Sequence, residues 1–278
     1  MFYKIDYYSF TILFDAPSVI RREELFNLVL KTFVSVSDFQ PERFLNISEY
    51  SVEQGARQYH YRLRHNSSEM ALSFGGINNH ILVECAGKTC DTFDSADLLY
   101  PLISATCERT TRIDFAVDIE TTEDPRTFSA FRNSKAFKSS GEQRTPSGRT
   151  NYVGGRKGER MARVYRYEPP HPRSHLLRVE AEYKGHAAKA AAGHLLEVGV
   201  RQACLDAHSP FQWTSPTWSP ENGSGIKIPY KAYRPENAAT VRWLYGDVVT
   251  ALSKALKKGL IDWDEWLKYV RKEAFGEE

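Results

Sequence analysis

Arg112-Ile-Asp-Phe-Ala-Val-Asp-Ile-Glu120 and Leu177-Arg-Val-Glu-Ala-Glu-Tyr-Lys184 are the two stretches that decide the fold of this chain. In both, apolar residues alternate with residues that are mostly charged. Because side chains along a β-strand point to opposite faces with a period of two, each stretch predicts a strand with one apolar and one acidic face. A third stretch, Met161-Ala-Arg-Val-Tyr-Arg-Tyr167, predicts a strand that carries Tyr165 and Tyr167 on one face.

If these three strands are neighbours in one sheet, carboxylates and a phenol share a surface. Mg²⁺ and Mn²⁺ prefer oxygen ligands, and carboxylates on a rigid sheet supply them, so this surface can hold a divalent cation beside a tyrosine. That combination suggests phosphoryl-transfer chemistry. The candidate metal ligands are, in order of preference, Asp114 and Asp118, then Glu180, Glu182 and Glu84.

The same carboxylates allow a second interpretation. Like charges that cluster without a cation repel one another, and each raises the pKa of its neighbours. Arg112 or Arg178 could neutralise part of this charge in a metal-free structural network, and the acidic faces could also be solvated. The sequence leaves these interpretations open.

The remaining pattern predicts an α+β fold with a central antiparallel sheet, flanking helices and a C-terminal helical region. Residues 135–150 lack periodicity and are rich in Gly, Ser and basic side chains, which predicts a flexible loop. We expect a first domain over 1–200, an irregular Pro-rich connector over 201–235 and the helical region over 236–278. Further expected strands cover 9–14, 58–64, 71–74, 80–86 and 151–155, and expected helices cover 22–33, 95–107 and 186–198, with a short one from Asp124.

Composition excludes some classes of protein. The 278 residues are 41% apolar and 26% charged, which is ordinary for a globular protein, and no run of ~18 apolar residues predicts a membrane span. The start lacks a signal-peptide pattern, and four cysteines show no metal-binding spacing, so a reducing cytoplasm is expected. Between Phe131 and Pro170, ten Lys or Arg face three Asp or Glu, which fits either a polyanion partner or a solvated loop.

An ordered set of short motifs resembles the replication initiation factor family, which includes rolling-circle plasmid and phage initiators and the relaxases of some conjugative elements. The resemblance covers residues from about 4 to about 192. The motifs are Ile5-Asp-Tyr-Tyr-Ser-Phe-Thr11, Val83-Glu-Cys-Ala-Gly-Lys-Thr-Cys90, Thr111-Arg-Ile-Asp-Phe-Ala-Val-Asp118, Thr150-Asn-Tyr-Val-Gly-Gly-Arg-Lys157, Ala162-Arg-Val-Tyr165 and Leu177-Arg-Val-Glu-Ala-Glu182.

The resemblance implies that Tyr165 is a catalytic nucleophile, because the family's nucleophile is the tyrosine of an Arg-apolar-Tyr motif. The usual continuation is an acid or Asn and then Lys, whereas this chain has Arg166 and Tyr167. The role of that lysine would then pass to another residue such as Lys157. Tyr167 becomes a rival nucleophile, because it shares a face with Tyr165.

The function implied is nicking and joining of a DNA strand through a 5′-phosphotyrosyl intermediate, with Mg²⁺ or Mn²⁺. Implied partners are single-stranded or supercoiled DNA at an origin, with a second copy of the chain and a helicase as further candidates. A non-catalytic DNA-binding relative and a water-using nuclease are the alternatives. Basic residues near the tyrosine would neutralise DNA phosphates, and the candidates are Arg149, Arg156, Lys157, Arg160 and Arg163.

Overall fold

The computed structural model describes most of the chain as far as Ile228. The described residues are 1–14, 21–37, 46–55, 58–75, 79–125, 130–131, 140–145, 148–154, 158–167, 173–213, 215 and 217–228, with 255, 262 and 264. For Arg22, 130–131, 140–145, 148–149 and Gln212, only the backbone is described. The chain divides into two compact units, Met1–Ile228 and Pro229–Glu278. The predicted helical region over 236–278 lies outside the described residues, apart from the three isolated positions.

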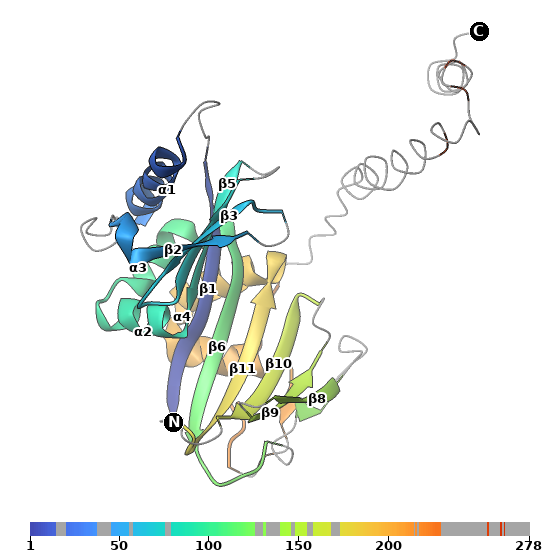
Figure 1. Cartoon of the computed structure of the whole chain (residues 1–278). Coiled ribbons are helices and arrows are strands. Elements are labelled where there is room, and N and C mark those ends of the chain that lie inside the picture. The colour runs from blue at the N-terminus through green and yellow to red at the C-terminus, as the bar shows by residue number, and fades with distance from the viewer. Residues whose placement is uncertain are drawn as a thin grey trace. The chain divides into compact units, whose positions relative to one another are not determined.

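The first unit is built on one large sheet in which every neighbouring pair of strands is antiparallel (Figure 1). Its order is β2-β3-β4-β5-β1-β6-β11-β10-β9-β8. The strands are β1 (Phe2–Leu13), β2 (Tyr50–Gln54), β3 (Tyr61–His65), β4 (Met70–Phe74), β5 (His80–Ala86), β6 (Thr110–Glu120), β8 (Ser140–Thr145), β9 (Gly148–Val153), β10 (Arg160–Arg166) and β11 (Leu176–Lys184). A separate small ladder pairs β7 (Ala130–Phe131) with β12 (Gln212–Trp213).

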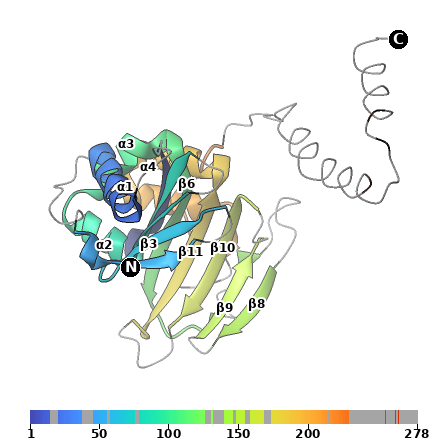
Figure 2. The same cartoon turned by 45° about the horizontal axis from the view of Figure 1, so that its top comes forward.

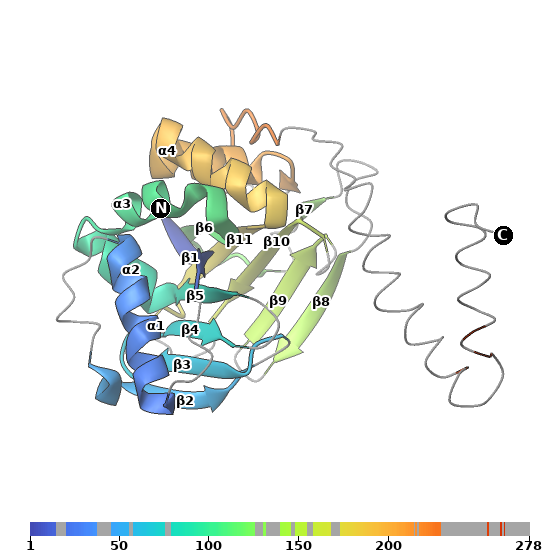
Figure 3. The same cartoon turned by 90° about the horizontal axis from the view of Figure 1, so that it is seen from above.

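Helices lie along one face of this sheet, as the view from above shows (Figure 3). They are α1 (Arg22–Ser37), α2 (Gly87–Ser95), α3 (Leu99–Thr106) and α4 (Gly185–His208), with short 3₁₀ turns η2 (Ile47–Glu49) and η3 (Cys107–Arg109). The apolar faces of the central strands and these helices form one core. Within the described residues, no helix is long and apolar enough to cross a membrane.

Small side chains allow α4 to pack closely on β1, β6 and β11. Four alanines in its first half are fully buried: Ala187, Ala188, Ala191 and Ala192. Tyr183 of β11 donates a 2.9 Å hydrogen bond to the carbonyl of Ala207, which ties the end of the helix to the sheet. At Gly199 the helix breaks, with φ of 78°, a backbone conformation that favours glycine.

The α+β prediction is confirmed, and most of the predicted strands and helices lie where the alternation and helical periodicity place them. The predicted flexible loop over 135–150 is wrong in part, because residues 140–145 form β8 and pair with β9 (Figure 2). The alternation of that segment is too polar to indicate a strand without its partner. Helix α2 and strand β2 were not predicted. Helix α4 continues past residue 200 to His208, into the expected connector, and the proposed domain division stays a prediction.

The alanine face of α4 yields a test of this packing. Ala191→Leu should lower the free energy of unfolding by about 1–3 kcal/mol, because a larger side chain has no space between the helix and the sheet. Chemical denaturation would measure it. Ala190→Leu is the matched control, because Ala190 is only partly buried, and it should change stability much less. Equal effects of both substitutions would contradict the packing described.

Candidate active site

The three strands that carry the acidic and tyrosine patterns are neighbours, in the order β6-β11-β10. Register places Ala116 and Arg163 on either side of Glu180, and Asp118 and Tyr165 on either side of Arg178. Directly opposed residues of an antiparallel pair point to the same face. These polar side chains therefore share the face that is opposite to α4, as the sequence predicted.

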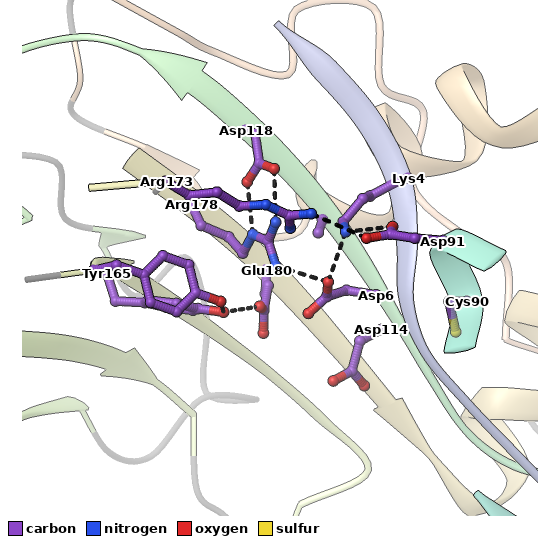
Figure 4. Close-up of polar contacts among 12 residues, drawn as sticks. Lys4, Asp6, Cys90, Asp91, Asp114, Asp118, Tyr165, Arg173, Arg178 and Glu180 are labelled. Carbon is purple, nitrogen blue, oxygen red and sulfur yellow. Dashed lines mark hydrogen bonds and ion pairs between the residues drawn. The ribbon is translucent and has the colours of Figure 1, made fainter. Parts of the chain in front are cut away.

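Tyr165 and Glu180 form the centre of this surface. The Tyr165 hydroxyl donates a hydrogen bond to Glu180 Oε1, and Arg163 Nε donates to Oε2 of the same carboxylate. Figure 4 shows the phenol directed at Glu180. The Glu180 carboxylate thus has a proton donor on one oxygen and a fixed cation on the other.

Burial raises the pKa of Glu180 to about 7, with Arg163 opposing the rise and the charges of Asp6 and Asp114 adding to it. A carboxylate with this pKa exists in both protonation states near neutral pH, so it can accept a proton and return it. Burial also raises the pKa of Tyr165 well above its usual value, and the negative charge of Glu180 adds to the rise, while Arg178 opposes it. Tyr165 is therefore a neutral phenol that needs a base, and Glu180 is in contact with it.

Arg178 is the most buried cation of the surface, with 3% of its side chain exposed. Its Nε and Nη2 donate to the two carboxylate oxygens of Asp118 at 2.6 and 2.7 Å. Its Nη1 donates to Asp6 Oδ1 at 2.7 Å. One guanidinium from β11 therefore holds carboxylates from β6 and β1 (Figure 4).

Asp6 is a site residue that the sequence pattern did not predict. Ile5 pairs with Phe115 and Tyr7 pairs with Asp114, so Asp6 is an extra residue, a β-bulge in β1. Burial disfavours its ionised form, but Arg178 and then Lys4 outweigh burial and lower the pKa of Asp6. The signal in the sequence was a break in the alternation. Ile5 and Tyr8 both belong to the core, whereas residues three positions apart on a regular strand point to opposite faces.

The other predicted carboxylates are also paired with cations. Asp114 accepts from Arg112 Nε at 2.8 Å and lies 3.5 Å from Arg163 Nη2. Glu182 lies 2.8 Å from Arg112 Nη2 and contacts Lys184. Burial raises the pKa of Asp114, although Arg112 and Arg163 oppose the rise.

Glu84 lies on the far side of β1. It accepts a 2.7 Å hydrogen bond from the Tyr7 hydroxyl and lies 3.2 Å from Arg62 Nη2. The five predicted metal ligands are thus on one face, but they are distributed among different cations. These carboxylates do not converge on one point.

A divalent cation finds oxygen donors of the right chemistry here, but not an arrangement that fits it. Within the described residues, no three His, Cys, Asp or Glu side chains are placed to hold a metal ion together. Each of these carboxylates is paired with a cation: for example, Arg112 pairs with Asp114, Arg163 with Glu180 and Arg178 with Asp118. The predicted ligand set stays a prediction, and no chemistry below depends on it.

The basic residues predicted to contact DNA are placed unequally. Arg163 lies at the centre of the site, with 26% of its side chain exposed. Arg160 pairs with Tyr183, on the face opposite to Tyr165, so the structure does not bring it to the phenol. The backbone of Arg149 belongs to β9, and its side chain is outside the described residues, as are Arg156 and Lys157.

Tyr167 and Arg166 replace the residues that usually follow the tyrosine of the motif. The Tyr167 hydroxyl lies 3.5 Å from that of Tyr165, and the rings meet edge to face with centroids 5.3 Å apart. Arg166 instead donates to the carbonyls of Thr121, Glu123 and His175 at 2.6, 2.9 and 3.1 Å. Arg166 therefore anchors two loops, and Tyr167 remains at the site.

Comparison with known proteins gives few matches. No protein-family model matches this chain, and no curated protein does. Among solved structures, the chain is similar to a rolling circle replication initiator protein from Geobacillus stearothermophilus, with 15% sequence identity and a TM-score of 0.49 over 75% of this chain and 84% of that one. Values this low carry no conclusion about function.

Removal of the Arg178 side chain tests the ion-pair network. Arg178→Met should lower the free energy of unfolding by about 3–5 kcal/mol, because it leaves the buried Asp118 without its cation and Asp6 with Lys4 alone. The measurement is urea denaturation. Arg21→Met is the control, because the exposed pair of Arg21 with Glu24 contributes at most about 1 kcal/mol. A loss no larger than that of the control would contradict the structural role of Arg178.

Proposed function

We propose that this protein nicks and rejoins one DNA strand through a 5′-phosphotyrosyl intermediate on Tyr165, as a rolling-circle replication initiator or a relaxase. The observation that carries the proposal is the hydrogen bond from the Tyr165 phenol to Glu180. A nucleophile in contact with a base, and a base oriented by a third group, is the general arrangement of covalent catalysis. Here Arg163 is that third group.

The reaction begins as Glu180 takes the phenol proton and the Tyr165 oxygen attacks a backbone phosphorus. The bond from phosphorus to the 3′ oxygen breaks, and the leaving oxygen takes the proton from Glu180. The product is a free 3′-hydroxyl and a phosphotyrosyl ester that retains the energy of the phosphodiester. Attack by a 3′-hydroxyl on that ester reverses the steps and rejoins DNA.

Arg112 and Arg163 are the best candidates to bind the scissile phosphate. Each has 26% of its side chain exposed, unlike Arg178. A guanidinium presents a planar fork that matches two phosphate oxygens, and it stabilises the charge that builds up as the phenol attacks. Buried carboxylates hold both arginines in place, so they need little rearrangement when DNA binds.

A role for Mg²⁺ or Mn²⁺ stays part of the proposal, and it rests on the sequence alone. Bound near the phosphate, such an ion would draw charge from it and fix its geometry. Because the described carboxylates are paired with cations, we assign no step to it. Addition of a chelator to a nicking assay tests this part independently of the tyrosine chemistry.

A non-catalytic DNA-binding relative is the second candidate, and the replacement of the motif's lysine by Tyr167 favours it. Against it, the guanidinium of Arg178 lies over the Tyr167 ring, 5.9 Å from its centroid. A cation is therefore present beside the position that the lysine would take. This contact supports the enzyme over the binding protein.

Two substitutions test the nucleophile and its base. Incubated with Mn²⁺ and a supercoiled plasmid that carries the DNA flanking the coding region, Tyr165→Phe should give no covalent adduct because it lacks the attacking oxygen. Glu180→Gln should slow adduct formation by about 100–10,000-fold, the usual contribution of a general base. Denaturing gels of labelled DNA measure the adduct, and filter binding should show that Tyr165→Phe still binds DNA.

Tyr3→Phe is the matched control, since Tyr3 pairs with Val117, away from the acidic face, and its adduct should equal that of the wild type. A wild-type protein that binds but never forms an adduct would support the non-catalytic alternative. Nicking without any adduct would instead indicate a nuclease that uses water. Loss of the adduct in Tyr167→Phe but not in Tyr165→Phe would move the nucleophile by two residues.

The nicking rate should depend on pH through Glu180. The base is the deprotonated carboxylate, whose pKa is about 7, so the rate should rise as pH increases through about 7 and then level off. At pH 5 it should be about 1% of the plateau, because that fraction of the carboxylate is ionised two pH units below its pKa. Single-turnover rates on an oligonucleotide would measure this, and Glu180→Gln should remove the dependence. A rate that falls over the same range would reject Glu180 as the base.

A further inference from the structure

We propose that Tyr167 is a second nucleophile, which cleaves a second DNA strand while Tyr165 still carries the first. This inference rests on the proposed nicking function and extends it to the strand-transfer step. Tyr167 follows Tyr165 by two residues on the same face, and the two hydroxyl oxygens are 3.5 Å apart. Two phenols at this separation can react in turn at one set of phosphate-binding groups.

The end of β10 is held so that Tyr167 stays at the site, although the strand ends at Arg166. The Arg166 side chain donates to the carbonyls of Thr121 and Glu123, which follow β6, and of His175, which precedes β11. These contacts use the backbone of both segments, so they restrain Arg166, the residue that directly precedes Tyr167. Tyr167 is partly buried, which leaves its ring reachable by a DNA strand.

One cation serves both phenols. The Arg178 guanidinium lies 5.9 Å from the centre of the Tyr167 ring, and the same group opposes the rise in the pKa of Tyr165. A positive charge beside a phenol favours the phenolate that forms as the oxygen attacks. The electrostatic support for the first nucleophile therefore extends to the second.

The first cleavage itself prepares the second. As a phosphate ester, Tyr165 has no hydroxyl proton, so Glu180 Oε1 loses its donor. A buried carboxylate oxygen that loses a hydrogen bond is destabilised. The Tyr167 hydroxyl, already beside that of Tyr165, is placed to supply the missing donor with a small shift. Glu180 can then act as the base a second time.

The chemistry balances without any further reactant. The Tyr167 proton passes to Glu180, its oxygen bonds to the phosphorus of a second strand, and the bond from that phosphorus to its 3′ oxygen breaks. The 3′ oxygen takes the proton from Glu180. The new 3′-hydroxyl then attacks the ester on Tyr165, returns a proton to the Tyr165 phenol through Glu180 and joins the two strands.

The test counts DNA strands per polypeptide. Full-length protein is incubated with two single-stranded oligonucleotides of different length, each spanning the nick site mapped on the supercoiled plasmid. Each has a short 5′ arm upstream of the nick, which carries the new 3′-hydroxyl and dissociates after cleavage, so the ester is trapped. On a denaturing gel, wild-type protein should show single adducts and also chains linked to both oligonucleotides. Because the chains are separated, two singly linked subunits of an oligomer are not mistaken for a double adduct.

Tyr167→Phe should form single adducts and lose double adducts by about 100-fold or more, as expected for removal of a nucleophile supported by a base. Mass spectrometry of wild-type double adducts should find phosphotyrosine esters on both Tyr165 and Tyr167. Tyr3→Phe should match the wild type in both products.

Three outcomes would overturn the proposal. Double adducts that persist in Tyr167→Phe would place the second ester elsewhere. Wild-type protein that forms single adducts only would leave the nicking function standing and remove the second nucleophile. Wild-type protein that forms no adduct at all would remove the proposed function and this inference together, and the gel distinguishes this case from the others.

Discussion

The ion pairs of Arg178 with Asp118 and Asp6 are the contacts on which the polar face of the sheet depends. Removing charges from water is costly, and it is tolerated only where each charge has a close partner with good geometry. Bonds of 2.6 to 2.7 Å to both carboxylates meet that condition. Since the three residues come from β11, β6 and β1, the pairing also fixes how these strands lie against one another.

The same principle extends across the surface. Two ion-pair networks form in the described residues, each with three carboxylates and three cations: Asp6, Asp91 and Asp118 with Lys4, Arg173 and Arg178, and Asp114, Glu180 and Glu182 with Arg112, Arg163 and Lys184. The charges balance, but the environments differ. Cations hold the pKa of Asp6 down, whereas burial raises that of Glu180 to about 7. Pairs of acids whose pKa values are moved apart in this way are suited to different roles, and only Glu180 is both near neutrality and in contact with a phenol.

The sequence predicts the strands of the site but not which charges pair within it. Alternation in residues 112–120 and 177–184 was enough to predict acidic faces, because period-two patterning is a local property. Which cation pairs with which carboxylate depends on register between strands far apart in the chain, and no local pattern encodes it. Asp6 was missed because a bulge disrupts the alternation on which the prediction relied. Strand β8 was missed because its residues are polar and become a strand only beside β9.

The small size of Ala116 affects the packing around Glu180. It lies directly across from Glu180 on the neighbouring strand, and it is fully buried. With only a methyl group at this position, Glu180 has no bulky neighbour directly across on β6. A bulkier residue here would crowd Glu180 without changing a single charge. The size of this one side chain therefore affects how closely the polar groups around Glu180 can pack.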